Sequence, residues 1–257
     1  MVAGGSVVRV GNNNQIIGMR IDASNTDNTI FGNGVLNPLP ITDINLTMNT
    51  FTDYTTGANL QDVSGRADII MNTFSGLAGT STHGLNLTAA GGSTMDLLVT
   101  GNTATNNSVA GLSIVAESGA TINAFDPNNA TAPTGIVNNT TTNNGNGIVL
   151  SGGTGSTINA VVENNTSTGN TLNGFLGETD GGTYNLFSMR NNAFSANGAN
   201  GAFLHYLNGG QFRSVSEDRT EDLNLNGVLD AGEDTDGDGL LDVANGTIDP
   251  GEDLNGN

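Results

Sequence analysis

The sequence predicts an all-β solenoid, in which short parallel strands coil around one axis and stack coil upon coil. Three observations lead to it. The chain of 257 residues has 38 Gly, abundant Asn and Thr, and no Cys, Trp or Lys, a composition typical of short strands and turns. A unit of nearly constant length recurs along most of the chain. Within each unit, apolar residues alternate with polar ones, as they do in strands.

Glycines give the length of the repeat. The first and third residues after each glycine are mostly apolar, as in Leu85 and Leu87, and this alternation predicts a strand with one face turned inward. One step is long because it carries an insertion around Ala124 to Ala132. The steps are 27, 27, 36, 27 and 27 residues, and they separate Gly57, Gly84, Gly111, Gly147, Gly174 and Gly201.

An asparagine followed by small polar residues precedes each of these glycines. Upstream of it lies an apolar strand, such as residues 97–99, so each repeat holds about three short strands joined by Asn- and Gly-containing turns. Because a stacked Asn can hydrogen-bond to its neighbours through both ends of its amide, we expect an Asn ladder at this turn. The motif begins at Asn49, Asn72, Asn102, Asn139, Asn165 and Asn192.

With this organisation the chain resembles the right-handed parallel β-helix family of pectate-lyase-like folds, most clearly in residues 137–150 and 191–198. The resemblance implies a right-handed parallel β-helix of about seven coils over residues 1–216, with residues 7–48 fitting the repeat more loosely. It implies no single activity, because the family includes polysaccharide lyases, hydrolases, epimerases and non-catalytic surface proteins.

Residues 217–257 form a second, acidic segment that we predict to bind calcium. It has thirteen acidic residues and one Arg, a net charge of −12 out of −19 for the whole chain. Residues 222–233 satisfy the pattern D-x-[DN]-x-[DN]-G-x5-E at every defined position, with Gly227 at the sharp turn. The predicted ligands are Asp222, Asn224, Asn226, the carbonyl of Val228, Asp230 acting through water, and Glu233 binding bidentately.

A second loop follows directly. Its predicted ligands are Asp234, Asp236, Asp238, the carbonyl of Leu240, and Asp242. It is less complete than the first, because Asn245 stands where an acid closes the site. A third loop begins at residues 252–257, after which the chain ends. The segment resembles dockerin-like or thrombospondin type 3 calcium repeats. Since Glu233 and Asp234 are adjacent, no helix fits between the loops, and we expect a packed calcium array rather than a paired EF-hand sensor.

The composition also bears on location and partners. Only calcium at extracellular concentration would neutralise so acidic a segment, so we expect an extracellular or cell-surface protein. The first residues lack the pattern of a secretion signal, and we expect the chain to be an internal piece or a processed subunit of a longer protein. No apolar run is long enough to insert in a membrane, and the negative charge disfavours nucleic acid as a partner.

For catalysis the sequence offers one pair of candidates. Glu163 and Arg190 each stand two residues before a ladder Asn, so we expect them to lie one above the other in consecutive coils. Such a pair suits either a sugar site or a surface ion pair. His83 and His205 stand at different phases of the repeat and form no column. Isolated turn or surface positions are expected for Asp22, Asp43, Asp53, Asp62, Asp68 and Asp96, and no catalytic residue is nominated.

Two functions remain open at this point. The first is a non-catalytic extracellular or cell-surface structural protein, in which calcium rigidifies or joins modules. In a sharper form, the acidic segment of one copy docks on the first coil of the next, and copies assemble head to tail. The alternative is a protein that binds or cleaves a polysaccharide along the face of its coils. The absence of Trp and Lys and the presence of just three Tyr weigh against the alternative.

Overall fold

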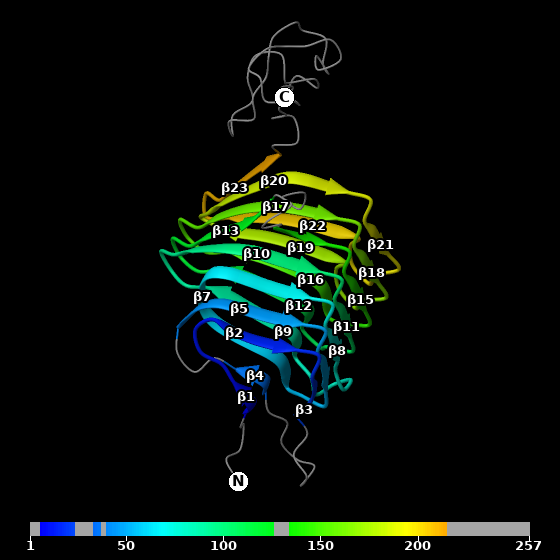
Figure 1. The fold of residues 1–257 in the computed structure, drawn as a ribbon. Coiled ribbons are helices and arrows are strands. Elements are labelled where there is room, and N and C mark those ends of the chain that lie inside the picture. The colour runs from blue at the N-terminus through cyan, green and yellow to red at the C-terminus, as the bar shows by residue number, and fades with distance from the viewer. Residues whose placement is uncertain (1–5, 24–32, 37–39, 126–133, 215–257) are drawn as a thin grey trace, which may run out of the picture.

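The computed structural model describes residues 6–23, 33–36, 40–125 and 134–214 (Figure 1). All regular structure in these residues is β, in a right-handed solenoid of about seven turns whose paired strands are all parallel. The predicted fold class is therefore confirmed. Residues 217–257, with every predicted calcium ligand, lie outside the described residues.

One side of the solenoid is a sheet of seven three-residue strands, one from each coil. Six of these strands follow the turn that the Asn motif marks, and the first, β3, follows a turn at Gly18 and Met19. The strands are β3 (Arg20–Asp22), β6 (Thr50–Thr52), β8 (Thr73–Ser75), β11 (Thr103–Thr105), β15 (Thr140–Thr142), β18 (Thr166–Thr168) and β21 (Ala193–Ser195).

The other two strands of each coil belong to one sheet of sixteen strands. Strands that precede the Asn turn are β2 (Asn14–Ile17), β5 (Ile41–Thr47), β10 (Thr94–Thr100), β13 (Thr121–Ala124), β14 (Gly135–Val137), β17 (Thr157–Glu163), β20 (Thr183–Arg190) and β23 (Gln211–Ser214). Strands that begin near the repeat glycines are β1 (Ser6–Arg9), β4 (Asn33–Leu36), β9 (His83–Ala89), β12 (Ala110–Ala116), β16 (Asn146–Gly152), β19 (Phe175–Asp180) and β22 (Ala202–Leu207).

The two groups of strands merge through β7 (Thr56–Ile70), which has 15 residues. Its first part pairs with β4 and β9, and its last part pairs with β5 and β10. The left-handed backbone at Asp62 and Gly65, with φ of 54° and 68°, lies where the pairing changes from one group to the other. The sequence predicts two separate strands here, and the structure has one bent strand.

The core is a column of apolar side chains inside the coils. Leu85, Leu87 and Ile69 are fully buried, and the rings of Phe51 and Phe74 stack on successive coils with centroids 4.7 Å apart. Alternate residues after the repeat glycines point inward, as predicted. β22, the last strand of the group that begins near the repeat glycines, differs, because no further coil among the described residues covers it. Its large exposed side chains are Phe203, Leu204, Tyr206 and Leu207.

The predicted Asn ladder runs through six consecutive coils. In each step an Asn Nδ2 donates to the Oδ1 of the Asn one coil further on, over 3.0 to 3.1 Å, from Asn49 to Asn192. The same Oδ1 also accepts from the backbone N of the preceding ladder residue. The turn is left-handed at the residue just before each of these Asn, with φ of 53° to 66°.

A second ladder, not predicted from the sequence, closes the other end of the short strands. It joins Asn107, Asn144, Asn170 and Asn197 through amide hydrogen bonds of 2.9 to 3.1 Å. In an earlier coil the hydroxyl of the buried Tyr54 donates to Asn107 Oδ1 over 3.1 Å. From β11 to β21, both ends of the short strands are thus held by amides that link one coil to the next.

The repeat glycines mark close contact between coils. A Cβ built on Gly147 would lie 2.5 Å from the carbonyl oxygen of Gly174 in the next coil and would overlap Ser167 Oγ. The 27-residue spacing therefore reflects a position that has no room for a side chain. The insertion lies between β13 and β14, which both pair with β10 and β17, so the stacking continues on either side of it.

Candidate functional site

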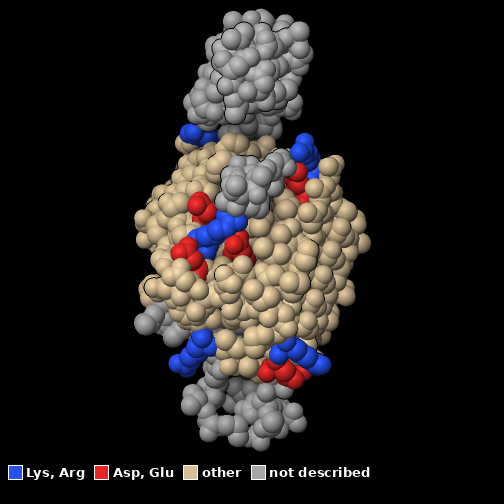
Figure 2. All heavy atoms as spheres, in the orientation of Figure 1, with Lys and Arg blue, Asp and Glu red and all other residues tan. Residues whose placement is uncertain are grey.

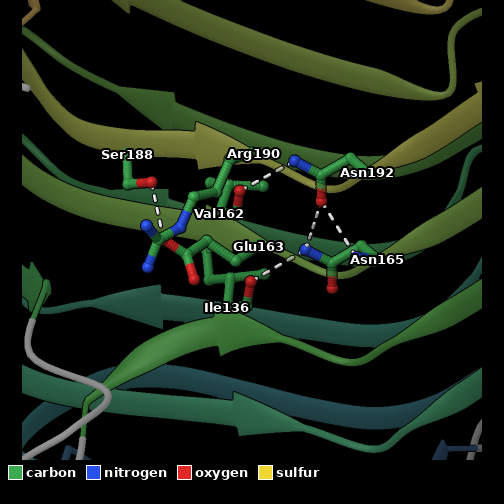
Figure 3. Close-up of polar contacts among 7 residues, drawn as sticks. All are labelled: Ile136, Val162, Glu163, Asn165, Ser188, Arg190 and Asn192. Atoms are coloured by element: carbon green, nitrogen blue, oxygen red, sulfur yellow. Dashed lines mark hydrogen bonds and ion pairs between the residues drawn. The ribbon is translucent and has the colours of Figure 1, made fainter.

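Glu163 and Arg190 lie one above the other, as their spacing predicts. They are register partners on β17 and β20, and Arg190 Nε lies 2.7 Å from Glu163 Oε1 (Figure 3). Ser188 Oγ donates to the same carboxylate oxygen over 2.6 Å. The Glu163 side chain is 10% exposed and that of Arg190 68%. The carboxylate is therefore engaged, while the guanidinium extends over the surface of the coils.

A group of charged side chains lies beside the first coils, on a face that is otherwise mostly uncharged (Figure 2). Arg66 and Asp68 of β7 form a two-point ion pair, with Nε–Oδ2 and Nη2–Oδ1 distances of 3.1 and 2.8 Å. Asp43 lies one coil before them, and its Oδ1 accepts from the backbone N of Arg66 over 2.7 Å. Asp43 and Asp68 were expected to be isolated, and this expectation is wrong. Asp68 pairs with Arg66 two residues away on β7, and the register shift between β5 and β7 places Asp43 against the backbone of Arg66.

These charges line a pocket of about 280 Å³, open to solvent, whose other walls are mostly amides. An array of carboxylates, amides and one guanidinium has hydrogen-bond donors and acceptors in the mixture that a polyhydroxylated ligand needs. The lining residues are Asn13, Asn14, Gln15, Asp43, Ile44, Asn45, Arg66 and Asp68.

The two histidines do not form a column, as expected. His83 pairs with Thr56 and Ala110 of the neighbouring coils, whereas His205 lies beside Glu178, at 3.7 Å. Burial disfavours the charged imidazolium and lowers the pKa of His83 below its usual 6.5.

Two regular arrays of hydroxyl and amide side chains were not recognised as surfaces from the sequence. On the sixteen-stranded sheet, Asp96, Asn123, Asn159 and Asn185 form an outward row joined by hydrogen bonds of 2.8 to 3.0 Å. On the seven-stranded sheet, two rows of Thr and Ser face outward. Both arrays have a pattern in the sequence that recurs in phase with the glycines. The pattern is T-x-[DN] for the row on the sixteen-stranded sheet and T-x-[ST] for the rows on the seven-stranded sheet.

Among the described residues, no group of three or more His, Asp and Glu is placed to hold a metal ion. In the same part of the chain, no helix is long and apolar enough to cross a bilayer. The predicted calcium loops lie outside the described residues. Comparison of the chain with protein-family models, curated proteins and solved structures gave no match. An assignment of function therefore rests on the fold and on the residues.

Proposed function

We propose that this chain is a non-catalytic structural module of an extracellular or cell-surface protein. In this proposal the solenoid is a rigid spacer, and the acidic segment binds calcium and stiffens the connection to the next module or copy. The observation that carries the proposal is the pair of amide ladders. Because each Asn in the interior of a ladder bonds to the coils on both sides, local opening of one such coil would break buried hydrogen bonds in three.

The calcium part of the proposal is supported by the residues of the acidic segment. Its first loop, with Asp222 and Glu233 at the ends, supplies the oxygen ligands that calcium prefers. Its charge is unfavourable without a counter-ion, so calcium would change both the shape and the interactions of this part of the chain. The affinity expected for such loops suits extracellular calcium concentrations.

The experiment is light scattering after size exclusion, in millimolar calcium and in excess chelator. The full chain is compared with a matched variant, Asp222→Asn with Glu233→Gln, which keeps the size of both side chains and removes two charges from the first loop. Calcium-dependent growth that the variant lacks would support head-to-tail assembly through the loops. A monomer that contracts on binding calcium would support a stiffened linker. A chain indifferent to calcium would contradict the proposal.

Polysaccharide binding is a second candidate, and the pocket around Arg66 favours it. Asp68 pairs with the guanidinium of Arg66, Asp43 accepts from the Arg66 backbone, and the surrounding amides add polar groups to the lining of the pocket. The test is a screen of soluble polysaccharides by affinity electrophoresis, repeated with Asp68→Asn and Arg66→Gln. Retardation lost in both variants would place a glycan here. Cleavage products lost in Arg190→Ala would instead indicate catalysis at the Glu163 pair.

A further inference from the structure

The outer face of the seven-stranded sheet carries two parallel rows of hydroxyl side chains. In each strand the first and third residues point outward and the middle residue points inward. The first row is Thr50, Thr73, Thr103, Thr140 and Thr166, and the second is Thr52, Ser75, Thr105, Thr142, Thr168 and Ser195. We refer to these two rows as the hydroxyl face.

The rows are in register without interruption. Every pair of neighbouring strands in this sheet matches residue for residue, whereas the sixteen-stranded sheet has register shifts at three of its pairings. The first Asn ladder holds one end of the strands from β6 to β21, and the second ladder holds the other end from β11 to β21, so each coil keeps the same position relative to the next. The hydroxyl face is therefore a lattice and not merely a surface rich in threonine.

The hydroxyl groups of this face are not used by the part of the chain that the structure describes. None of those in the two rows makes a hydrogen bond to another described residue, although Thr141 and Ser167 on the inner side of the same strands bond to each other over 2.7 Å. The Oγ1 of Thr52, in β6, is closed to solvent and also has no partner among the described residues. For the remaining hydroxyls, no partner other than water is found among the described residues.

The face is also electrically neutral. Strands β6, β8, β11, β15, β18 and β21 contain no charged residue, and Arg20 and Asp22 of β3 stand at one end of the sheet. No aromatic ring points outward from these strands to stack against a sugar, because Phe51, Phe74 and Phe194 occupy inward positions. The chemistry of the face is a repeat of threonine hydroxyl and methyl groups, with serine at Ser75 and Ser195.

The spacing of the lattice follows from the fold. Neighbouring strands lie about 4.8 Å apart, and residues two apart on a strand are separated by about 6.6 Å. A threonine has a stiff χ1, so its hydroxyl and methyl groups are held at nearly fixed positions on such a sheet. The prism face of hexagonal ice also has two repeat distances between water molecules, which lie at right angles and are comparable in size to these two spacings.

We infer that the hydroxyl face binds ice. Its hydroxyls would replace water molecules in the outermost layer of the crystal, and its methyl groups, which offer no hydrogen bond, would lie over gaps in that layer. Each contact is weak, and binding depends on many contacts at one spacing, which the six consecutive coils provide. The inference does not depend on the calcium segment or on the proposed structural role.

The test is partition of the full chain between a slowly growing ice front and the remaining liquid, together with inhibition of ice recrystallisation. Thr140→Tyr places a bulky ring in the middle of the hydroxyl face and is expected to abolish both effects. The matched control is Thr121→Tyr, because Thr121 is also an outward, half-buried strand residue but lies on the sixteen-stranded sheet. Circular dichroism and the melting temperature show whether each variant folds.

If the fraction of folded wild-type chain taken up by the ice is no higher than that of an unrelated protein, the inference is overturned, whatever the variants do. Equal incorporation of both tyrosine variants would show that another face binds. Cellulose or chitin particles added as competitors give the third outcome. A chain that binds these crystalline polysaccharides and not ice would also overturn it, and would favour the polysaccharide function instead.

Discussion

Arg190 Nε lies 2.7 Å from Glu163 Oε1 in the preceding coil, and the same oxygen accepts a hydrogen bond from Ser188. Replacing Arg190 with Ala removes one partner from a mostly buried carboxylate, while Ser188 remains. Because the guanidinium is largely exposed, we expect a loss of about 1 kcal/mol in the free energy of unfolding. Urea denaturation measures it, with Glu163→Gln as the control that keeps the acceptor for Ser188. A loss in the control as large as in Arg190→Ala would contradict this account.

The Asn ladder predicts a difference between its middle and its end. Asn139 is buried, donates to Val99 O and Asn165 Oδ1, and accepts from the amide of Asn102. Asn139→Ala leaves several buried groups without partners, at about 1–3 kcal/mol each, so we expect unfolding or a loss of more than 3 kcal/mol. At the last ladder position, Asn192→Ala should be milder, because fewer buried partners are lost there. Similar losses from chemical denaturation would count against the ladder as a cooperative element.

The left-handed turn before the ladder holds a residue poorly suited to it. Met71 has φ of 53° and is 61% exposed, and Asn138, Asn164 and Asn191 occupy the equivalent position in later coils. Since Asn tolerates this conformation better than other non-glycine residues, Met71→Asn should stabilise the chain by about 0.5–1 kcal/mol.

The control for this change is Leu77→Asn. Leu77 is also exposed and apolar but has no positive φ, so the substitution should give no gain. Thermal melting of both variants distinguishes relief of backbone strain from a general effect of a more polar surface. An equal rise in melting temperature for the two would refute the conformational explanation.

His83 predicts a dependence of stability on pH. Its folded pKa lies below the usual 6.5 because burial disfavours the charged form, so the unfolded chain binds more protons just below pH 6.5. The contribution to stability is complete above that pH and declines as the pH falls toward the folded pKa. We expect His83→Gln to flatten this part of the curve of unfolding free energy against pH, measured by urea denaturation between pH 7.5 and 5. An unchanged slope in the variant would assign the dependence to other groups.

The sequence by itself determined the all-β fold, the length of the coil, the Asn ladder and the stacking of Glu163 on Arg190. These features depend on periodicity, and a side chain at a fixed phase of a stacked repeat has its neighbour one period away. The calcium loops at residues 222–242 remain a prediction from the sequence pattern. They do not depend on any residue of the described coils.

Only the tertiary structure decided three other features. The bend in β7 merged two predicted strands, because the pairing partners of a strand fix where it turns. The register shift between β5 and β7 placed Asp43 beside Arg66 and its ion-pair partner Asp68. The second ladder, from Asn107 to Asn197, was recognised only in the structure, because it required knowing that the Asn after each short strand is turned inward and stacked on the next. The hydroxyl face emerged because threonines that are ordinary strand residues one at a time become a lattice once the register and the unused hydroxyls are known.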